Sequence, residues 1–325
     1  MLSTCIHHLK PQPPWLLFLS FTGFLTLLKP SISLFKWVFI TFLRPPRNLK
    51  KSYGSWAVVT GATDGIGKAF AYQLAGKGLN LILVSRDPNK LKTVSKEIQA
   101  DFPNTHVKIV RFDFSGDILA SVRLLEEAIK GLDVGILINN VGITYPAAMY
   151  FHEVDEKVWM NVVKVNLEGT TRVTKAVLPG MMQRKRGTIV NIGSGAAIVV
   201  PSHPLYTIYA ATKAYIDQLS RSLHVEYMQY GIHVQCQVPL YVATKMGSKV
   251  AAIERTSMFT PSAEDYARAA VRRIGYEVRC TPYWAHSLQW CFARFLPDTV
   301  LDSWRLSIGI QRRGKITACI KSCFG

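Results

Sequence analysis

Two tyrosines stand near one lysine in the stretch LYTIYAATKAY, and a phenol beside an ammonium group can move protons. On a helix that starts near residue 205, Tyr206, Tyr209 and Lys213 all lie close to one face. Tyr209 is four residues from Lys213, about 6 Å of helical rise, whereas Tyr206 is seven residues away, about 10.5 Å. A nearby cation lowers the pKa of a phenol from its usual value of about 10. The spacing therefore favours Tyr209 as the acid–base group and leaves Tyr206 as a pocket or packing residue.

A serine upstream could assist that chemistry. The segment VNIGSGAA ends a strand-like run and places Ser194 at the carboxyl edge of a sheet, where open α/β sheets bind ligands. Its hydroxyl can donate to a carbonyl oxygen as negative charge develops there. Ser202 is the competing serine, and it lies in a loop bounded by prolines.

The segment VVTGATDGIGKAF predicts a dinucleotide-binding turn between the first strand and a helix. Gly61 permits the turn, Gly65 lets a pyrophosphate approach the backbone, and Gly67 lets helix and strand pack closely. The helix N-terminus would then face the phosphates. The predicted cofactor contacts in this turn are Gly61, Thr63, Asp64, Gly65, Ile66 and Gly67.

The ends of the next strands predict the rest of the cofactor site. Ser85-Arg86 stands where an enzyme that prefers NAD carries an acid, and Arg86 could accept a 2′-phosphate, which favours NADP(H). Asp87 is either a ribose ligand or only the cap of the following helix. Asp113, in FDF, is an expected adenine contact.

The segment INNVG places small polar residues at the end of the fourth strand, where they can border a cofactor. We expect Asn140 and Gly142 to do so, with Asn139 beside them. These residues, like Asp113, could equally be turn residues that satisfy the local backbone.

Short apolar runs alternate with longer amphipathic ones from Trp56 onward. The strand-like runs are WAVVT, LNLILVS, HVKIVRF, VGILINN, GTIVNIG and IHVQCQV, and helical patterns lie near 65–77, 88–101, 116–130, 154–182 and 205–230. Strands that are apolar on both faces and separated by helices indicate a parallel sheet covered on both sides. The sequence predicts an α/β fold with a doubly wound, Rossmann-like sheet.

The charge of the 325-residue chain is concentrated at its ends. The net charge is +18; residues 1–53 carry seven basic residues and no acid, and residues 268–325 carry ten basic and three acidic residues. This charge flanks apolar segments rather than a nucleic-acid motif, so attraction to anionic membrane lipid explains it better than nucleic acid does. The six cysteines are scattered and suggest neither a disulfide framework nor a zinc site, so no metal is expected.

The segment WLLFLSFTGFLTLLKPSISLFKWVFITFL predicts a membrane anchor. Residues 15–28 are too few to span the bilayer as a straight helix, and Lys29-Pro30 separates them from a second apolar run over 31–43. The two runs could form one kinked span or a re-entrant hairpin, and a cleaved signal peptide is the competing interpretation. The basic cluster RPPRNLKK that follows should stay cytoplasmic, which puts the catalytic part on the cytosolic side.

The predicted organisation is therefore a hydrophobic anchor (1–45), a basic linker (46–53), a Rossmann-like NADP-binding catalytic domain (54–275) and an aromatic and basic extension (276–325). Within the extension, Trp284, Leu288, Phe292 and Phe295 recur at helical spacing. This pattern suits either a membrane-facing lid or acyl-chain wall, or a core helix packed on the sheet.

Taken together, TGATDGIG, NNVG, Ser194 and YAATK resemble the short-chain dehydrogenase/reductase family over roughly residues 54–250. The resemblance implies that Tyr209 is the general acid in reduction and that Lys213 lowers its pKa and binds the cofactor ribose. It implies that Ser194 binds and stabilises the substrate carbonyl. It adds a fourth catalytic member, Asn166 in KVNLEGT, which would hold a water that relays protons past Lys213.

The segments LHVEYMQYGIHVQCQVPLYVATKM and YEVRCTPYWAHSL are similar to one subgroup of that family, the plant very-long-chain 3-oxoacyl-CoA reductases. Pro239-Leu240 replaces the Pro-Gly of the wider family, a change that the subgroup shares, and Val242 and Thr244 should still touch the nicotinamide end of NADPH. The resemblance implies an endoplasmic-reticulum membrane protein that reduces a long-chain acyl-CoA beside the other fatty-acid elongase subunits. The basic tail could then contact lipid or, equally, the phosphates of coenzyme A. Its oligomeric state stays open, a homo-oligomer included.

One departure from the subgroup leaves other functions open. The chain ends CIKSCFG, whereas subgroup members often end in a lysine-rich retrieval signal. Retention would then rest on the anchor or on partners, and a divergent paralogue with other substrates or weak activity is an alternative. The rival functions are a steroid or retinoid oxidoreductase with the same catalytic set and a non-catalytic elongase subunit that binds NADPH.

Overall fold

The computed structural model describes residues 13–251 and 255–324, which divide after Pro45 into an N-terminal unit and an α/β body. The N-terminal unit is helix α2 (Pro14–Val38), which continues as a π-helical turn, η1 (Phe39–Leu43). Pro30 lies inside α2, so the two apolar runs form one helix rather than the two arms of a hairpin. This 30-residue segment has a mean hydropathy of 1.4 and, among the residues described, is the one helix long and apolar enough to cross a membrane.

Four hydroxyl groups of α2 bond inside the helix. Thr22 donates to the carbonyl of Phe18 (2.9 Å) and Ser31 to that of Leu27 (2.7 Å), and Thr26 and Ser33 bond to the backbone in the same way. Such internal bonds suit a hydrocarbon environment, because the bilayer core offers no water to replace them.

The body alternates strands and helices from Leu49 onward. Its strands are β1 (Trp56–Thr60), β2 (Asn80–Ser85), β3 (Val107–Arg111), β4 (Val134–Asn139), β5 (Gly187–Ile192), β6 (Ile232–Gln237) and β7 (Arg279–Cys280). Its helices are α3 (Leu49–Tyr53), α4 (Gly65–Ala75), α5 (Pro88–Asp101), α6 (Ile118–Ile129), α7 (Glu156–Val163), α8 (Thr170–Arg184), α9 (Gly195–Ile198), α10 (Thr207–Tyr227), α11 (Lys245–Ala251), α12 (Ala263–Arg272), α13 (Trp284–Ala293) and α14 (Asp298–Phe324). Short turns complete it: η2 (Phe151–Glu153), the π-helical η3 (Lys164–Gly169) and η4 (Met228–Tyr230).

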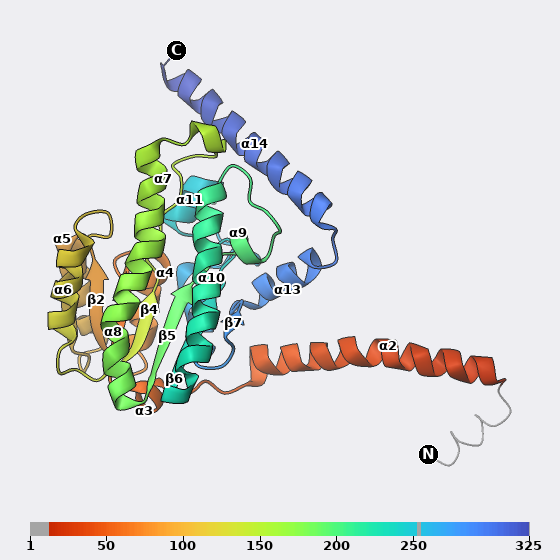
Figure 1. The fold of residues 1–325 in the computed structure, drawn as a ribbon, viewed down its shortest axis with the longest axis horizontal. Coiled ribbons are helices and arrows are strands. Elements are labelled where there is room, and N and C mark those ends of the chain that lie inside the picture. Colours follow the sequence, from red (N-terminus) through yellow and green to blue (C-terminus); the bar gives the residue numbers. More distant parts are fainter. Residues whose placement is uncertain (1–12, 252–254, 325) are drawn as a thin grey trace. The chain divides into compact units, whose positions relative to one another are not determined.

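The strands form one parallel sheet in the order β3-β2-β1-β4-β5-β6-β7 (Figure 1). Helices α4, α5 and α12 cover one face, and α6, α8 and α10 cover the other. The strand order reverses between β1 and β4, and in open α/β sheets ligands bind outside the carboxyl ends of the strands at such a point. The predicted doubly wound sheet is confirmed.

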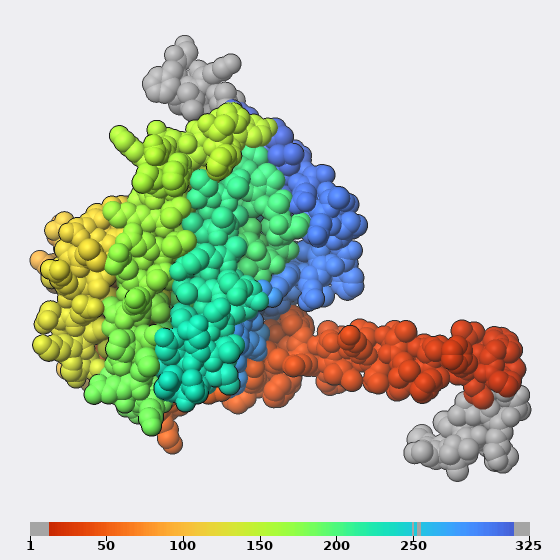
Figure 2. All heavy atoms as spheres, in the orientation of Figure 1, coloured from red at the N-terminus to blue at the C-terminus, as the bar shows by residue number. Residues whose placement is uncertain are grey.

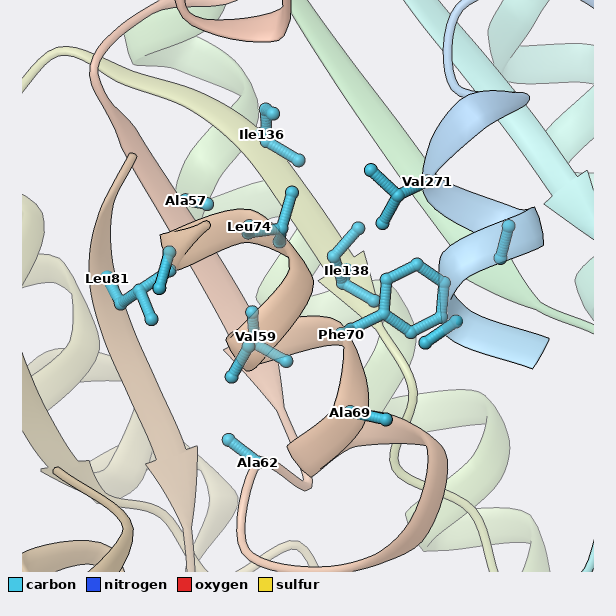
Figure 3. Close-up of a cluster of buried hydrophobic side chains, with 14 of the residues drawn as sticks. Ala57, Val59, Ala62, Ala69, Phe70, Leu74, Leu81, Ile136, Ile138 and Val271 are labelled. Atoms are coloured by element: carbon cyan, nitrogen blue, oxygen red, sulfur yellow. The ribbon is translucent and has the colours of Figure 1, made fainter. Parts of the chain in front are cut away.

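Helix α4 is packed between the sheet and α12, and this packing fixes the start of the helix. Phe70 and Leu74 of α4 are fully buried against Val59 and Ile138 of the sheet, and Val271 of α12 lies beyond Phe70 (Figure 3). Because apolar surface is removed from water on both sides of α4, its N-terminus is held rigidly at the edge of β1.

Two predicted boundaries are wrong. Residues 46–53 are not a linker, because they include α3, whose Leu49 and Tyr53 are buried in the same core as α4. The α/β unit does not end at residue 275 either, since β7 pairs with β6 at Arg279–Cys280. A two-residue strand and a one-turn helix carry too little periodicity to be recognised locally. The helix expected over 154–182 is also interrupted, by the π-helical turn η3.

Replacing Leu49 by alanine tests whether residues 46–53 belong to the core. Leu49 is 3% exposed, so Leu49→Ala should lower the free energy of unfolding by about 2–5 kcal/mol. The exposed Lys51 is the matched control, and Lys51→Ala should change it by less than about 0.5 kcal/mol. Urea unfolding of the full chain in detergent measures both. Equal stability of the two variants would mean that the segment is a linker after all.

Candidate active site

A glycine-rich turn joins β1 to α4 and forms a backbone cradle. The amide of Gly61 donates to Val84 of β2 (2.8 Å), and the Thr63 hydroxyl lies 3.0 Å from that of Ser85. A Cβ at Gly67 would lie 2.3 Å from the carbonyl oxygen of Gly61, so only glycine lets the helix approach the turn this closely. Because the first-turn amides of α4 point out of this side-chain-free surface, the cradle fits the pyrophosphate of a dinucleotide.

The turn is held by its neighbours on two sides. Asp64 caps α4 by accepting from the amide of Gly65 (2.8 Å), and its other carboxylate oxygen pairs with Lys245 (2.5 Å). Partial burial opposes ionisation, but the Lys245 ammonium and the Gly65 amide outweigh it and lower the pKa of Asp64. The methyl group of Thr244 lies 3.3 Å from where a Gly65 Cβ would be. The segment after β6 therefore reaches over the cradle, where we expect Thr244 and the buried Val242 to meet a cofactor.

The end of β2 carries unpaired positive charge. Asp87 is engaged as the cap of α5, because its Oδ1 accepts from the amides of Asn89 (3.0 Å) and Lys90 (3.1 Å). Arg86 is exposed and forms no ion pair with any described residue. Lys90 acts electrostatically on Asp64 of the turn, so a second cation lies near the cradle. Sequence analysis missed Lys90, whose nearness to the turn depends on how α5 packs.

The other predicted cofactor residues at the strand ends also organise the backbone. Asp113 accepts from the amide of Ser115 (3.0 Å) and is half-buried. Asn140 joins β4 to β1, since its side chain donates to the carbonyl of Thr60 (3.1 Å) and its backbone amide to the Thr60 hydroxyl (2.9 Å). Both residues therefore have a structural role, and contact of either with a cofactor stays a prediction.

Tyr209, Lys213 and Ser194 come together at the carboxyl end of β5. Tyr209 and Lys213 lie one turn apart on α10, and the Lys213 Nζ is 6.0 Å from the centre of the Tyr209 ring. Ser194 caps α9 directly after β5 and forms a hydrogen bond with the Tyr209 hydroxyl. The ammonium of Lys213 donates to the carbonyl of Ile192 (2.8 Å), which fixes it beneath the tyrosine. The arrangement presents two hydroxyl groups to one carbonyl oxygen.

The pKa of Tyr209 does not shift as expected from the sequence, which predicted that Lys213 would lower it. Burial raises the pKa of Tyr209; the hydrogen bond from Ser194 opposes the change and the nearby Tyr241 adds to it. Lys213 does not lower that pKa in the protein alone, because its ammonium is directed at Ile192 and burial lowers its own pKa to about 8. Tyr209 is therefore held as the protonated phenol at neutral pH, the form that donates a proton.

Asn166 lies in the π-helical turn η3, and this irregular turn directs its amide towards Lys213. Its Oδ1 accepts from the amide of Ile143 (2.8 Å), and its Nδ2 donates to the Ile143 carbonyl (2.9 Å) and to the Thr212 hydroxyl (3.0 Å). A Cβ at Gly142 would lie 3.3 Å from the Lys213 Nζ and 3.5 Å from the Asn166 Oδ1. Asn166, Gly142 and Lys213 thus meet at one point, as π-helical turns often do for functional residues.

The residues considered as alternatives to Tyr209 and Ser194 make other contacts. Tyr206 is 3% exposed and stacks on Tyr145, with ring centres 5.8 Å apart. The Ser202 hydroxyl is hydrogen-bonded to Asp302 of α14. Tyr206 is thus the packing residue that the spacing indicated.

Helices α13 and α14 contact the segments beside Ser194 and before α10. His286 of α13 is fully buried and bonds to the backbone of Leu240 and Tyr241 (3.3 and 3.1 Å). Further along, Phe292 of α13 and Phe295 just beyond it are 70% and 80% exposed, while Trp290 and Ala293 on the same helix still pack against buried residues.

Helix α14 lies against segments that precede α10, and in Figure 2 the blue C-terminal segment adjoins the green one. Besides Asp302 on Ser202, Arg313 pairs with Glu153, and Gly309 packs on Leu205. Leu205 has φ = 62°, a conformation unusual for a branched residue, two positions before α10 begins. Contacts from α14 therefore hold the backbone that leads into the helix of Tyr209.

Replacing Lys213 by methionine tests the electrostatics. Because its pKa is about 8 in the folded protein and about 10.4 in the unfolded chain, the wild type gains stability as pH rises between those values. Lys213→Met removes the cost of the buried charge but loses the bond to Ile192. We expect it to be more stable than wild type by about 1–2 kcal/mol at pH 7, with the difference shrinking towards pH 10.

Urea unfolding of the full chain without added nucleotide, at several pH values, measures this difference. Lys175→Met, at an exposed position of α8, should show neither the gain nor its pH dependence. A Lys213→Met variant that is less stable than wild type at pH 7 would contradict the buried-charge explanation.

Comparison with known proteins places this geometry in a family. A family model described as short chain dehydrogenase matches residues 55–255. An Arabidopsis thaliana protein named as very-long-chain 3-oxoacyl-CoA reductase-like is 60% identical over 96% of this chain and 99% of its own. A human protein named inactive hydroxysteroid dehydrogenase-like protein 1 is 43% identical over 84% of this chain and 82% of its own.

Solved structures agree. A short-chain dehydrogenase from Sphingobium yanoikuyae in complex with NADPH is 28% identical, covers 78% of this chain and 94% of its own, and superposes with a TM-score of 0.62. Its bound nucleotide matches in kind the dinucleotide that the glycine cradle fits. The chain belongs to the short-chain dehydrogenase family and is a nicotinamide-dependent oxidoreductase.

Proposed function

We propose that the protein catalyses the NADPH-dependent reduction of long-chain 3-oxoacyl-CoA to 3-hydroxyacyl-CoA. The observation that carries the proposal is the intact group of Ser194, Tyr209 and Lys213 beside the glycine cradle. The substrate class is supported by the 60% identity to the Arabidopsis protein named as 3-oxoacyl-CoA reductase-like.

The residues of the chain divide the work of carbonyl reduction. When bound, NADPH supplies a hydride to the carbonyl carbon. Ser194 donates a hydrogen bond to the carbonyl oxygen and stabilises the negative charge that develops there. Tyr209, protonated at neutral pH, gives its proton to that oxygen, so the C=O bond becomes CH–OH. Lys213 and Asn166 hold the positions from which Tyr209 can be reprotonated.

The preference for NADPH rests on the charges at the end of β2. Arg86 is exposed and forms no ion pair with any described residue. Lys90 acts electrostatically on Asp64 of the turn and lies 4.0 Å from the carboxylate of Asp87, which is occupied as a helix cap. A 2′-phosphate would therefore meet two cations, and the ribose hydroxyls of NADH would find no free acid.

Replacing Arg86 tests the cofactor preference. Arg86→Ala should raise KM for NADPH about tenfold and leave KM for NADH within about twofold, because it removes one charge-assisted hydrogen bond. Lys92→Ala removes an exposed cation from the same helix as Lys90 and should change neither value. A parallel loss for both cofactors would show that Arg86 does not read the 2′-phosphate.

The setting of the enzyme is proposed from the N-terminal unit. Helix α2 is long and apolar enough to span a bilayer, and the basic residues that follow it favour the cytosolic side for the body. A long acyl chain partitions into lipid, so a membrane-tethered reductase would find its substrate at the surface. We further propose that the membrane is that of the endoplasmic reticulum and that the protein associates there with other elongase subunits.

The central experiment measures NADPH consumption by the detergent-solubilised full chain with a long-chain 3-oxoacyl-CoA. Tyr209→Phe should lower kcat by at least about a hundredfold while NADPH still binds, because only the transferable proton is lost. Tyr206→Phe removes the hydroxyl of a stacked, buried ring and should change kcat less than about threefold.

Two other results of this experiment would assign a different function, and the human relative that is named inactive suggests one of them. Wild-type turnover of estrone in place of the acyl-CoA would make the protein a steroid oxidoreductase. NADPH binding without turnover of either substrate would make it a non-catalytic subunit, as the human relative's name suggests for that protein.

A further inference from the structure

Two arginines of α14 converge on a single phenol next to the catalytic group. Arg305 and Arg312 both donate to the hydroxyl oxygen of Tyr241, at 3.3 and 3.0 Å. They are seven residues apart, about 10.5 Å of helical rise, so they lie two turns apart on one face of α14 and approach Tyr241 from either side. Arg305 also contacts a ring nitrogen of His203 at 2.6 Å.

This cluster has positive charge without a matching carboxylate. Arg305 is 8% exposed, and its Nε has no hydrogen-bond partner. Neither arginine forms an ion pair within the described part of the chain, since Asp302 is bonded to Ser202 and Glu153 to Arg313. Buried arginines are normally paired, because taking an unpaired cation out of water is unfavourable. A buried, unpaired guanidinium group therefore indicates an anionic ligand.

The neighbours of the arginines respond to that charge. Burial, together with Arg305 and Arg312, lowers the pKa of His203 to about 3, so the histidine is neutral and adds no cation. Burial raises the pKa of Tyr241, but the two arginines outweigh it and the net shift is downward. The pKa of each group shifts in response to the positive charge of the two arginines, and neither group is a carboxylate that would balance that charge.

The cluster adjoins the reaction centre. Tyr241 follows Leu240, whose side chain lies 3.1 Å from where a Gly195 Cβ would be, directly after Ser194. Tyr241 also raises the pKa of Tyr209, so the two phenols are electrostatic neighbours. The ring of His203 lies 5.5 Å from that of Tyr206, at the start of the helix that carries Tyr209. An anion held here would belong to a molecule whose reactive carbonyl is at Tyr209.

We propose that Arg305, Arg312 and Tyr241 form an anion-binding subsite that receives a phosphate group of the coenzyme A moiety of the substrate. Guanidinium groups match phosphate geometry with paired N–H donors, and two of them converging from positions two turns apart suit a polyanion better than a single carboxylate. The inference rests on the proposed function, because it assumes that the carbonyl at Tyr209 belongs to an acyl-CoA.

The test compares one 3-oxoacyl chain carried on coenzyme A with the same chain carried on pantetheine, which has no phosphate. Arg312 is half-buried and easier to replace than Arg305. Arg312→Gln should raise KM for the coenzyme A ester about tenfold with kcat reduced less, while KM for the pantetheine ester changes less than about twofold. Arg312→Lys should recover part of the loss. Arg294→Gln, at an exposed arginine of the same extension, should behave as wild type with both esters.

Two results would overturn the subsite. An equal loss for both esters would mean that Arg312 supports the fold or the thioester rather than a phosphate. An increase in KM for NADPH would mean that the arginines serve the cofactor.

Failure of the proposed function has a separate signature. If the wild type turns over neither ester, binding of free coenzyme A to the full chain, measured by titration calorimetry, tests the subsite by itself. Affinity lowered about tenfold in Arg312→Gln, but unchanged in Arg294→Gln, would support the subsite. Affinity equal to that of the wild type in both variants would reject it.

Discussion

Two adjacent asparagines at the end of β4 connect the halves of the site. Asn140 reaches to β1, where it bonds to Thr60 at the start of the glycine turn. Asn139 faces the other way and donates to Thr174 of α8 (2.9 Å) and to Asn191 of β5 (2.8 Å). Asn191 in turn donates to Ser220 of α10 (2.9 Å), the helix that carries Tyr209. A shift at this junction would change the register between the nucleotide cradle and the proton donor.

The hydrogen-bonded side chains that run from Asn139 through Asn191 to Ser220 are buried. They constrain the positions of the strands and helices more than they add to stability. A buried hydrogen bond contributes little net free energy, but leaving one partner unsatisfied is expensive. Alternative arrangements of the strands would separate these partners, and the arrangement in which all of them meet is favoured. The motifs NNVG and VNIGSGAA therefore belong to one hydrogen-bonded network.

The sequence predicted the features that depend on short-range pattern. Strands with apolar residues on both faces, the spacing of Gly61, Gly65 and Gly67, and the choice of Tyr209 over Tyr206 follow from periodicity and helical rise. The structure confirms the strands and the sheet, whereas the role of Tyr209 stays a prediction that the stacking of Tyr206 on Tyr145 supports. Asp87 was ambiguous in the sequence because a cap and a ribose ligand need the same residue type, and only its bonds to α5 separate the two.

What could not be predicted depends on contacts between distant segments. Leu49 is buried because α12 and the sheet surround it, and its own neighbours give no hint of this. The pKa of Tyr209 rises because burial exceeds the effect of a lysine that is itself bonded to Ile192. From the sequence, the positive charge of the C-terminal extension suited lipid and the phosphates of coenzyme A equally, with no residue singled out. In the folded protein Arg305 and Arg312 are instead collected around Tyr241, about 65 to 70 residues earlier in the chain.

The position of α14 in the chain has a consequence for synthesis. The apolar helix α2 emerges from the ribosome early, whereas Asp302, Gly309 and Arg313, which contact segments before α10, emerge much later. Domains generally fold as units as they are completed. Leu205 holds an unfavourable backbone angle against which Gly309 packs, so the backbone before Tyr209 gains this support only after α14 has been synthesised. A membrane anchor formed by α2, as proposed above, would therefore be in place before the helix of Tyr209 is fully supported.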